Sequence, residues 1–395
     1  MKPIVILSAF LLSVFLFGNI SAQVNLNGWL QSNLYVLEND QENQQWDFYQ
    51  GLQFRISPKN YSNLYFNTFM RLAYRGDPAE WQEKAYNLYA NWGIGKNYRV
   101  RVGRMFYYKG VINGTIDAGE VAATFGGKLQ LNAVIGTESP FDRKFKIKNW
   151  DNGNVLGGYL SYRLPWNNSI NVSYFQKERL SELYWQVFGS SLQGYLGNYL
   201  NYYLRYDHNL LSEQYQAMRY RLIFNKEKWS LGVEYNAQQP RIYEDSYFTI
   251  FEVDAYRQIR AIGTYWLGKV EFGLQYLYTM YDEDNDNRII ASLGTRRYGS
   301  FGVVYQTGYG GENVGYYADL RYEFIPNWTA HFYNSYYKFE RALTSISQDA
   351  VAFRAGLGYR WTNRFIVEGE VQQSSNSYYS NDFRGLMRLT YLFKY

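Results

Sequence analysis

Arginine is the residue type in this chain best suited to act on another molecule. It recurs at alternate positions of short segments, at Arg55, Arg71, Arg99, Arg101, Arg219, Arg221, Arg321, Arg354, Arg360, Arg384 and Arg388. A guanidinium stays charged and binds a carboxylate or phosphate through two parallel hydrogen bonds. Carboxylates follow the same pattern at Glu234, Glu271, Asp319, Glu323, Glu368 and Glu370. Two interpretations stay open: the arginines attract anions, or they pair with carboxylates on neighbouring segments and brace the structure.

Catalytic chemistry finds little support in the residue types. His208 and His331 are the only histidines, and the chain has no cysteine. Neither histidine lies in a nucleophile motif, and no phosphate-binding loop or haem-attachment motif occurs. The acidic stretch 282–287 begins like a calcium loop, but Asn287 and Leu293 stand where that loop needs Gly and Glu. We therefore expect no enzyme, no cofactor and no bound metal.

The segments that carry the charges repeat with a period of two residues. Between residues 64 and 72 the even-numbered side chains are mostly apolar and the odd-numbered ones mostly polar. Residues 316–324, 351–361 and 365–372 alternate in the same way. Side chains of a strand point to opposite faces in turn, so this pattern predicts strands with one apolar and one polar face.

The connections between these segments are of two kinds. Short, turn-like ones fall at 57–60, 95–97, 165–168, 226–228, 268–269, 326–327 and 362–363. Longer polar ones fall between them, at 38–46, 75–83, 137–154, 239–253, 282–287 and 374–382. Tight turns that alternate with longer loops are typical of an up-and-down membrane β-barrel. The stretch 178–206 is the most ambiguous, because 183–206 fits two strands whereas 178–188 also fits a short helix in a loop.

Tryptophan positions give an independent indication. Six tryptophans lie in or beside the proposed short turns: Trp92, Trp166, Trp229, Trp266, Trp328 and Trp361. An indole prefers the interface between membrane and water, so this clustering predicts an aromatic girdle at one end of a barrel. A soluble β-sandwich gives no reason to gather tryptophan beside the turns of one end.

The N-terminus and the composition indicate export. Lys2 precedes an apolar run from residue 4 to 17, and Ala22 ends a stretch of the kind that a signal peptidase cleaves. We expect residues 1–22 to be a cleaved signal peptide and 23–395 to be one domain. The alternative, a membrane anchor, would need a run of about 20 apolar residues. The net charge of +5 is small for 395 residues and implies no nucleic-acid partner.

The last strand-like segment, Gly385 to Tyr395, carries the most specific pattern. Met387, Leu389, Tyr391 and Phe393 fall on one face, and Arg388, Thr390 and Lys394 fall on the other. The segment resembles the closing strand of Gram-negative outer-membrane barrels, which ends in an aromatic residue that the barrel-assembly machinery reads. The fold expected from this resemblance is all-β, a transmembrane antiparallel up-and-down β-barrel. Its strand number should be even and about 22, with 18 or 20 as the alternatives.

The chain resembles porin-like outer-membrane barrels more generally, and its Tyr- and Asn-rich character resembles Bacteroidota sequences. In porins a strand can rise into a loop that folds inward and narrows the pore, and the stretch 98–120 is similar to that pattern. The resemblance makes Arg104, Lys109, Asp117 and Glu120 constriction candidates, whereas an ordinary external loop is the alternative. Strands that begin at Val24 leave no room for the plug of a TonB-dependent transporter.

The function that the resemblance implies is a channel. We expect passive diffusion of small hydrophilic solutes, leaning towards anions if the arginines line the lumen. The alternative is a structural or assembly barrel without an open pore, which would anchor polysaccharide or scaffold a secretion or electron-transfer complex. The expected partners are outer-membrane lipid, the assembly machinery, small polar solutes and two further copies in a homotrimer. The expected location is the outer membrane of a Gram-negative bacterium.

Overall fold

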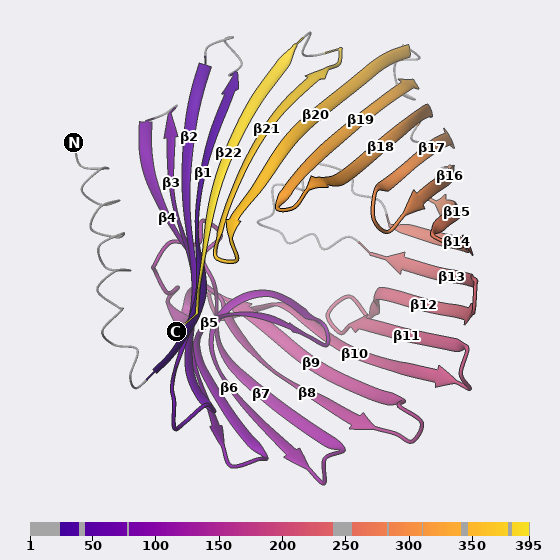
Figure 1. Ribbon diagram of the computed structural model, residues 1–395. Coiled ribbons are helices and arrows are strands. Elements are labelled where there is room, and N and C mark those ends of the chain that lie inside the picture. The colour runs from indigo at the N-terminus through magenta and orange to yellow at the C-terminus, as the bar shows by residue number, and fades with distance from the viewer. Residues whose placement is uncertain are drawn as a thin grey trace, which may run out of the picture.

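The chain forms one closed antiparallel β-barrel of 22 strands (Figure 1). The computed structural model describes residues 24–38, 44–76, 79–239, 255–282, 284–309, 311–340, 347–377 and 381–394. The predicted signal peptide (1–22), Tyr395, and most of the predicted loop 239–253 lie outside the described residues. None of the described helical segments is long and apolar enough to cross a membrane.

The strands follow one another around the ring in chain order. Their bounds are β1 (Val24–Glu38), β2 (Gln44–Pro58), β3 (Leu64–Gly76), β4 (Ala79–Ile94), β5 (Tyr98–Lys109), β6 (Ile112–Phe125), β7 (Leu129–Glu138), β8 (Asn154–Arg163), β9 (Ser169–Arg179), β10 (Glu182–Leu196), β11 (Leu200–Asn209), β12 (Gln214–Lys226), β13 (Trp229–Gln238), β14 (Tyr256–Leu267), β15 (Val270–Met280), β16 (Asn285–Thr295), β17 (Gly299–Gly308), β18 (Glu312–Ile325), β19 (Trp328–Glu340), β20 (Ser347–Thr362), β21 (Phe365–Ser375) and β22 (Asp382–Lys394). A 3-10 turn, η2 (Trp150–Asn152), precedes β8.

The ring closes where the first strand meets the last. β1 pairs with β22 in an antiparallel register that runs from Asn27↔Lys394 to Leu37↔Arg384. On the inner side of this seam, Gln31 donates to Thr390 Oγ1 at 3.2 Å and Arg388 donates to Asn33 Oδ1 at 3.0 Å. Closure satisfies the backbone hydrogen bonds of both edge strands, which a lipid bilayer cannot do.

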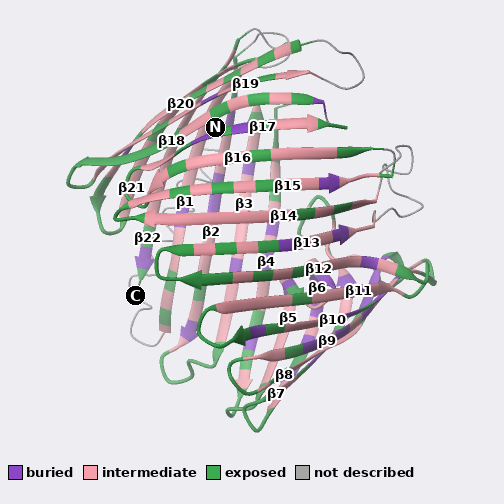
Figure 2. Cartoon of the chain, turned by 90° about the vertical axis from the view of Figure 1, so that its right-hand side faces the viewer, coloured by how far each residue is buried: buried purple, intermediate pink, exposed green. Residues whose placement is uncertain are grey.

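The alternation predicted from the sequence decides which side chains face outward. Leu131, Ile135, Val233 and Leu274 are among the exposed apolar residues of the outer face. Figure 2 shows exposed residues recurring along β13–β16 on that side. The polar residues between them face the lumen, as in outer-membrane barrels.

The strand count and the ambiguous stretch agree with the sequence-based predictions. β10 and β11 both fall within residues 182–209, so the possible helix at 178–188 is a strand end, a two-residue turn and a strand start. The predicted long loop at 75–83 is wrong, because β3 continues to Gly76 and β4 begins at Ala79. The polar residues Glu80, Gln82 and Glu83 of this stretch belong to β4.

Candidate functional site

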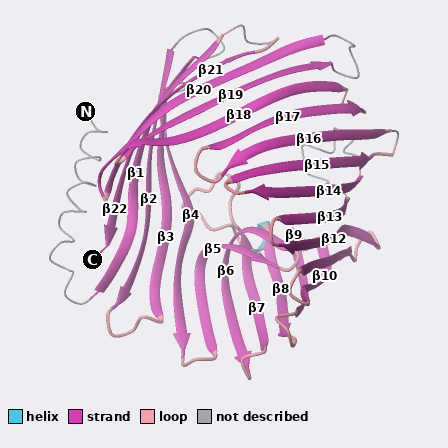
Figure 3. Cartoon of the chain, turned by 45° about the vertical axis from the view of Figure 1, so that its right-hand side comes forward, coloured by secondary structure: helices cyan, strands magenta, loops and turns pink. Residues whose placement is uncertain are grey.

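The barrel wall is interrupted where the β5–β6 hairpin turns inward. β4 pairs with β5 only up to Leu88↔Arg104, whereas β5 and β6 stay paired to Lys109↔Ile112. β6 meets β7 only from Ile116. Residues 104–115 therefore leave the wall, and we call them the inward hairpin. Figures 1 and 3 both show its tip inside the ring, directed towards β9 and β10.

Gly103 makes this departure sterically allowed. Its φ angle is 123°, a region that side-chain-bearing residues rarely adopt. A Cβ at this position would also collide with the carbonyl oxygen of Leu88. The bend thus lies at the last residue before β5 parts from β4.

The tip of the inward hairpin is hydrogen-bonded to the opposite part of the wall. The backbone N–H of Val111 donates to Ser173 Oγ of β9 at 3.2 Å. Arg205 of β11 donates to the carbonyl of Gly110 at 3.0 Å, and Lys109 donates to Asn132 Oδ1 of β7 at 2.7 Å. These contacts place the tip on the inner faces of β7, β9 and β11.

An apolar cluster fills the space beneath the inward hairpin. Its members are Met105, Tyr107, Val111, Ile112, Ile116, Ala118, Val134, Val155, Phe175, Trp185 and Val187, each at most 6% exposed. The rings of Tyr107 and Phe175 meet edge to face at 5.8 Å. Each large side chain that is buried in this way stabilises the contact by about 1.5–3 kcal/mol. The inward hairpin is therefore a fixed part of the barrel.

A buried carboxylate gathers positive charge beside this cluster. Glu120 is 1% exposed and forms ion pairs with Lys109 at 2.9 Å, with Arg99 at 3.5 Å and with Arg101. Three cations around one anion leave an excess of positive charge on this part of the lumen wall. Two of the four constriction candidates, Lys109 and Glu120, thus belong to one ion-pair group.

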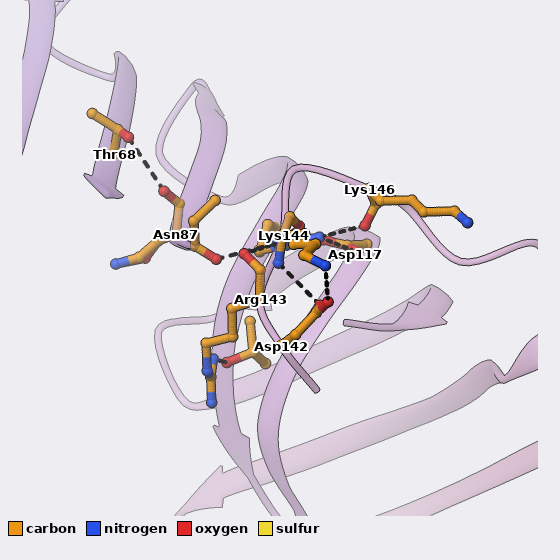
Figure 4. Close-up of polar contacts among 10 residues, drawn as sticks. Thr68, Asn87, Asp117, Asp142, Arg143, Lys144 and Lys146 are labelled. Carbon is orange, nitrogen blue, oxygen red and sulfur yellow. Dashed lines mark hydrogen bonds and ion pairs between the residues drawn. The ribbon is translucent and has the colours of Figure 1, made fainter. Parts of the chain in front are cut away.

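The other two constriction candidates, Arg104 and Asp117, form a second group on the opposite face of the hairpin. Arg104 Nε and Nη2 donate to the two Asp117 carboxylate oxygens at 2.7 and 2.8 Å. Its Nη1 donates to the carbonyls of Ala85 and Lys144 at 3.2 and 2.7 Å, and its Nη2 donates to Lys146 at 2.8 Å. Both side chains are buried, and Figure 4 shows the loop residues around them. All four candidates lie on strands of a hairpin and not on the irregular loop that we expected.

The β7–β8 connection closes the gap that the hairpin leaves beside β4. Within this bridging loop, residues 139–149, the Arg143 carbonyl accepts a hydrogen bond from the Ala85 N–H at 2.8 Å. The Arg143 side chain donates to Thr115 Oγ1 at 2.6 Å and lies over the Tyr86 ring at 5.3 Å. Asp142 accepts a hydrogen bond from the Lys144 backbone N–H, which lowers the pKa of its carboxyl below the usual value. The bridging loop takes the place of the missing strand neighbour.

The predicted lumen-facing charges are mostly engaged with neighbours. Besides Arg99 and Arg101, four of the predicted arginines form ion pairs: Arg219–Glu234 at 2.8 Å, Arg354–Glu370 at 4.0 Å, Arg388–Glu368 at 3.4 Å and Arg384–Asp382 at 2.6 Å. Three lie over tyrosine rings: Arg55 over Tyr65 at 3.5 Å, Arg71 over Tyr49 at 5.0 Å and Arg221 over Tyr203 at 5.7 Å. Arg321, Glu323, Arg360 and Glu368 line one recess with His331, and Asp319 lies two residues before Arg321 on β18.

The six tryptophans lie at the end of the barrel that carries the short turns. Trp92, Trp166, Trp229 and Trp361 are more than half exposed. Trp266 differs, because it lies on the same inner face of β14 as Arg260, six residues earlier. Its ring lies 4.7 Å from the Arg296 guanidinium.

Several residues of the site were missed by reasoning from the sequence. Arg205 and Asp207 pair at 2.7 Å on the inner face of β11, and Lys177 and Arg179 pair with Glu138 at 2.7 and 3.0 Å. Val134 and Phe175 are apolar residues at positions that face the lumen. An apolar patch in the lumen would contact water unless another segment packed on it, so these residues could have predicted the inward hairpin.

The histidines and the acidic stretch 282–287 were the residues considered for metal binding. Within the described ranges, no group of three or more His, Cys, Asp or Glu side chains could hold a metal ion. His208 pairs with Tyr206 through Nδ1 at 3.3 Å. Asp286 and Asn287 of the acidic stretch belong to the start of β16.

Comparison with known proteins identifies the fold. No protein-family model matches the chain, and no curated protein matches it. The P pilus usher (PapC) translocation pore is similar with a TM-score of 0.51 at 8% identity, over 93% of this chain and 99% of that one. OccAB3 of Acinetobacter baumannii matches with a TM-score of 0.47 at 11% identity, over 95% of this chain and 100% of that one. A BenF-like porin of Pseudomonas fluorescens Pf-5 matches with a TM-score of 0.44 at 9% identity, over 95% of this chain and 99% of that one. The chain has the fold of an outer-membrane β-barrel.

Proposed function

We propose that this chain is a porin-like channel of the Gram-negative outer membrane for passive diffusion of small hydrophilic solutes. One observation carries the proposal: a closed 22-stranded barrel with a polar inner face holds a hairpin that is fixed inside it. Barrels of roughly 16–18 strands already enclose a water-filled channel. A wider ring has room for water beside an inward hairpin, and the hairpin limits the size of what passes.

Swelling of proteoliposomes tests this function. Vesicles that contain the folded barrel should swell quickly in an isotonic monosaccharide and slowly in an isotonic trisaccharide, because the inward hairpin narrows the path. Vesicles with the heat-denatured protein are the control. Swelling rates equal to that control in every sugar would contradict the proposal.

A modest preference for anions belongs to the same proposal. The positive excess around Glu120 supports it, whereas the ion pairs of Arg219, Arg354 and Arg388 limit it. An arginine that is paired with a carboxylate attracts a passing anion only weakly, so we expect the preference for anions to be small.

Glu120→Gln tests the anion preference. Removing the carboxylate leaves Arg99, Arg101 and Lys109 uncompensated, so the reversal potential in a KCl gradient should move further towards that of chloride. Glu227→Gln is the matched control, because Glu227 lies in the exposed β12–β13 turn outside the barrel wall. Cation selectivity of the unmodified protein, or equal potentials for both variants, would refute the preference.

A structural or assembly barrel without an open pore remains the second candidate. The P pilus usher (PapC), whose fold is similar, is a translocation pore. A scaffold of this kind would give no swelling in any sugar without its partner, so the same experiment separates the two functions.

We propose the setting of the barrel by analogy with porin-like outer-membrane proteins. Outer-membrane lipid would surround the outer face, the assembly machinery would read β22, and three copies would associate. The many tyrosines and asparagines favour a Bacteroidota source. Mass measurement in detergent should find three copies, and a single copy would contradict the trimer.

A further inference from the structure

A polar recess lies between the tip of the inward hairpin and the inner faces of β8–β11. Its volume is about 230 Å³. Tyr108, Lys109 and Gly110 contribute from the hairpin, and Tyr159, Asn171, Ser191, Gln193, Tyr203 and Arg205 are among the wall residues that line it. Pockets for drug-sized ligands enclose about 300–1,000 Å³. The recess therefore suits one small polar unit.

The charged side chains that line this recess are already paired. Lys109 binds Glu120 at 2.9 Å. Arg205 chelates Asp207 through Nε and Nη2 at 3.0 and 2.7 Å, and it also donates to the Gly110 carbonyl. An ion entering the recess would meet compensated charges, so the recess favours a neutral occupant.

Neutral side chains supply the hydrogen-bonding surface. The Tyr159 hydroxyl donates to Asn171 Oδ1 at 2.8 Å, and Asn171 Nδ2 donates to Ser191 Oγ at 3.1 Å. This hydrogen-bonded series crosses three strands. The Tyr159 oxygen, which also bonds to Ser161, keeps one lone pair, Asn171 keeps a second N–H, and Ser191 keeps its hydroxyl hydrogen. Donors and acceptors that alternate at such spacing match the hydroxyl groups of a sugar, each of which donates and accepts.

Two tyrosines give the recess apolar faces. Tyr159 of β8, the first member of the hydrogen-bonded series, and Tyr203 of β11 line the recess, with β9 and β10 between their strands. An aromatic ring presents a flat apolar face beside a polar tip. The C–H face of a pyranose ring is apolar in the same way, whereas an apolar solute would leave the Asn171 and Ser191 groups without partners.

We infer that this recess binds a single neutral sugar unit on its way through the barrel. The inference rests on the proposed channel function and adds a substrate class to it. A solute passing the inward hairpin would exchange water for the hydrogen bonds of Asn171 and Ser191. Such a site would favour sugars over neutral polymers of equal size.

Sugar-dependent interruptions of the single-channel current test the site. At least one of D-glucose, D-galactose and N-acetylglucosamine should interrupt the current, with a frequency that saturates as its concentration rises. A polyethylene glycol of equal hydrodynamic size is the control solute and should only reduce conductance in proportion to its concentration. Asn171→Ala should weaken sugar binding about tenfold, the effect of losing one to two hydrogen bonds. Asn67→Ala, on the inner face of β3 and away from the recess, should leave it unchanged.

The outcomes separate this inference from the channel proposal. Normal conductance steps without interruptions by any sugar would overturn the sugar site while the channel stands. Calorimetry in detergent measures sugar binding without any pore, so it decides the site even if no conductance is seen. Equal affinity of the unmodified protein and Asn171→Ala for the sugar would also overturn the inference.

Discussion

Arg104 shows how a single side chain can hold a wall together where two strands part. Its guanidinium donates to both Asp117 carboxylate oxygens and to four backbone carbonyls, one from β4 and three from the bridging loop. Carbonyls at the edge of an interrupted sheet lack strand partners, and an arginine fork satisfies several of them at once. From the sequence Arg104 was recognisable as a candidate. Its partners were not, because 13 to 42 residues separate it from them.

Arg104→Ala tests this role. The change leaves Asp117 buried without its partner, so the free energy of unfolding should fall by about 3–5 kcal/mol. Urea unfolding in lipid vesicles, followed by tryptophan fluorescence, measures it. Arg384→Ala is the matched control: the Arg384 side chain is 58% exposed, and we expect a loss of about 0–1 kcal/mol.

The double variant Arg104→Ala/Asp117→Ala provides a second check. Removing both charges should restore part of the stability that Arg104→Ala loses. A loss for Arg104→Ala no larger than for Arg384→Ala would show that the guanidinium does not hold the gap closed.

At the scale of elements, the inward hairpin is where the sequence-based prediction was least complete. Of the four constriction candidates, Arg104 and Lys109 belong to the inward hairpin, whereas Asp117 and Glu120 lie where β6 has rejoined β7 in the wall. Their local form was mistaken, because the glycines suggested a loop whereas Ile112, Ile116 and Glu120 continue a strand pattern. The bend depends on a left-handed glycine and on contacts to β9 and β11, neither of which local patterning reveals.

Gly103→Ala tests the bend. The Ala Cβ would meet the Leu88 carbonyl and force an unfavourable φ, at a cost of about 1–3 kcal/mol or more. We expect weaker docking of the hairpin and faster proteolysis of the bridging loop at Arg143 and Lys144. Gly126→Ala is the control, since Gly126 has a positive φ but nothing near its Cβ. Equal proteolysis of the two variants would argue against a bend fixed by Gly103.

At the scale of the whole molecule, much of the fold was predictable from the sequence. Alternation and turn spacing predicted an even-numbered barrel of about 22 strands because every strand must present one face to lipid and one to water. The pairing of lumen charges was left open. The register between neighbouring strands decides which charges pair. If β12 and β13 were shifted by two residues, Arg219 would have a partner other than Glu234.

The two faces of the wall make a prediction of their own. Leu274 lies on the outer face and is 58% exposed, whereas its neighbour Gln275 faces the lumen. Leu274→Arg should destabilise the barrel in lipid by about 2–4 kcal/mol, and Gln275→Arg should have little effect. Folding yield into lipid vesicles measures both. A larger loss for Gln275→Arg would reverse the assignment of faces.

Single-channel conductance in a planar bilayer tests the central claim most directly. An open lumen narrowed by a fixed hairpin predicts stable current steps of one defined size. Gly103→Ala, which loosens the hairpin, should add noise and larger steps, whereas Gly126→Ala should not. A well-folded barrel that inserts and gives no steps would contradict the account and indicate a closed scaffold.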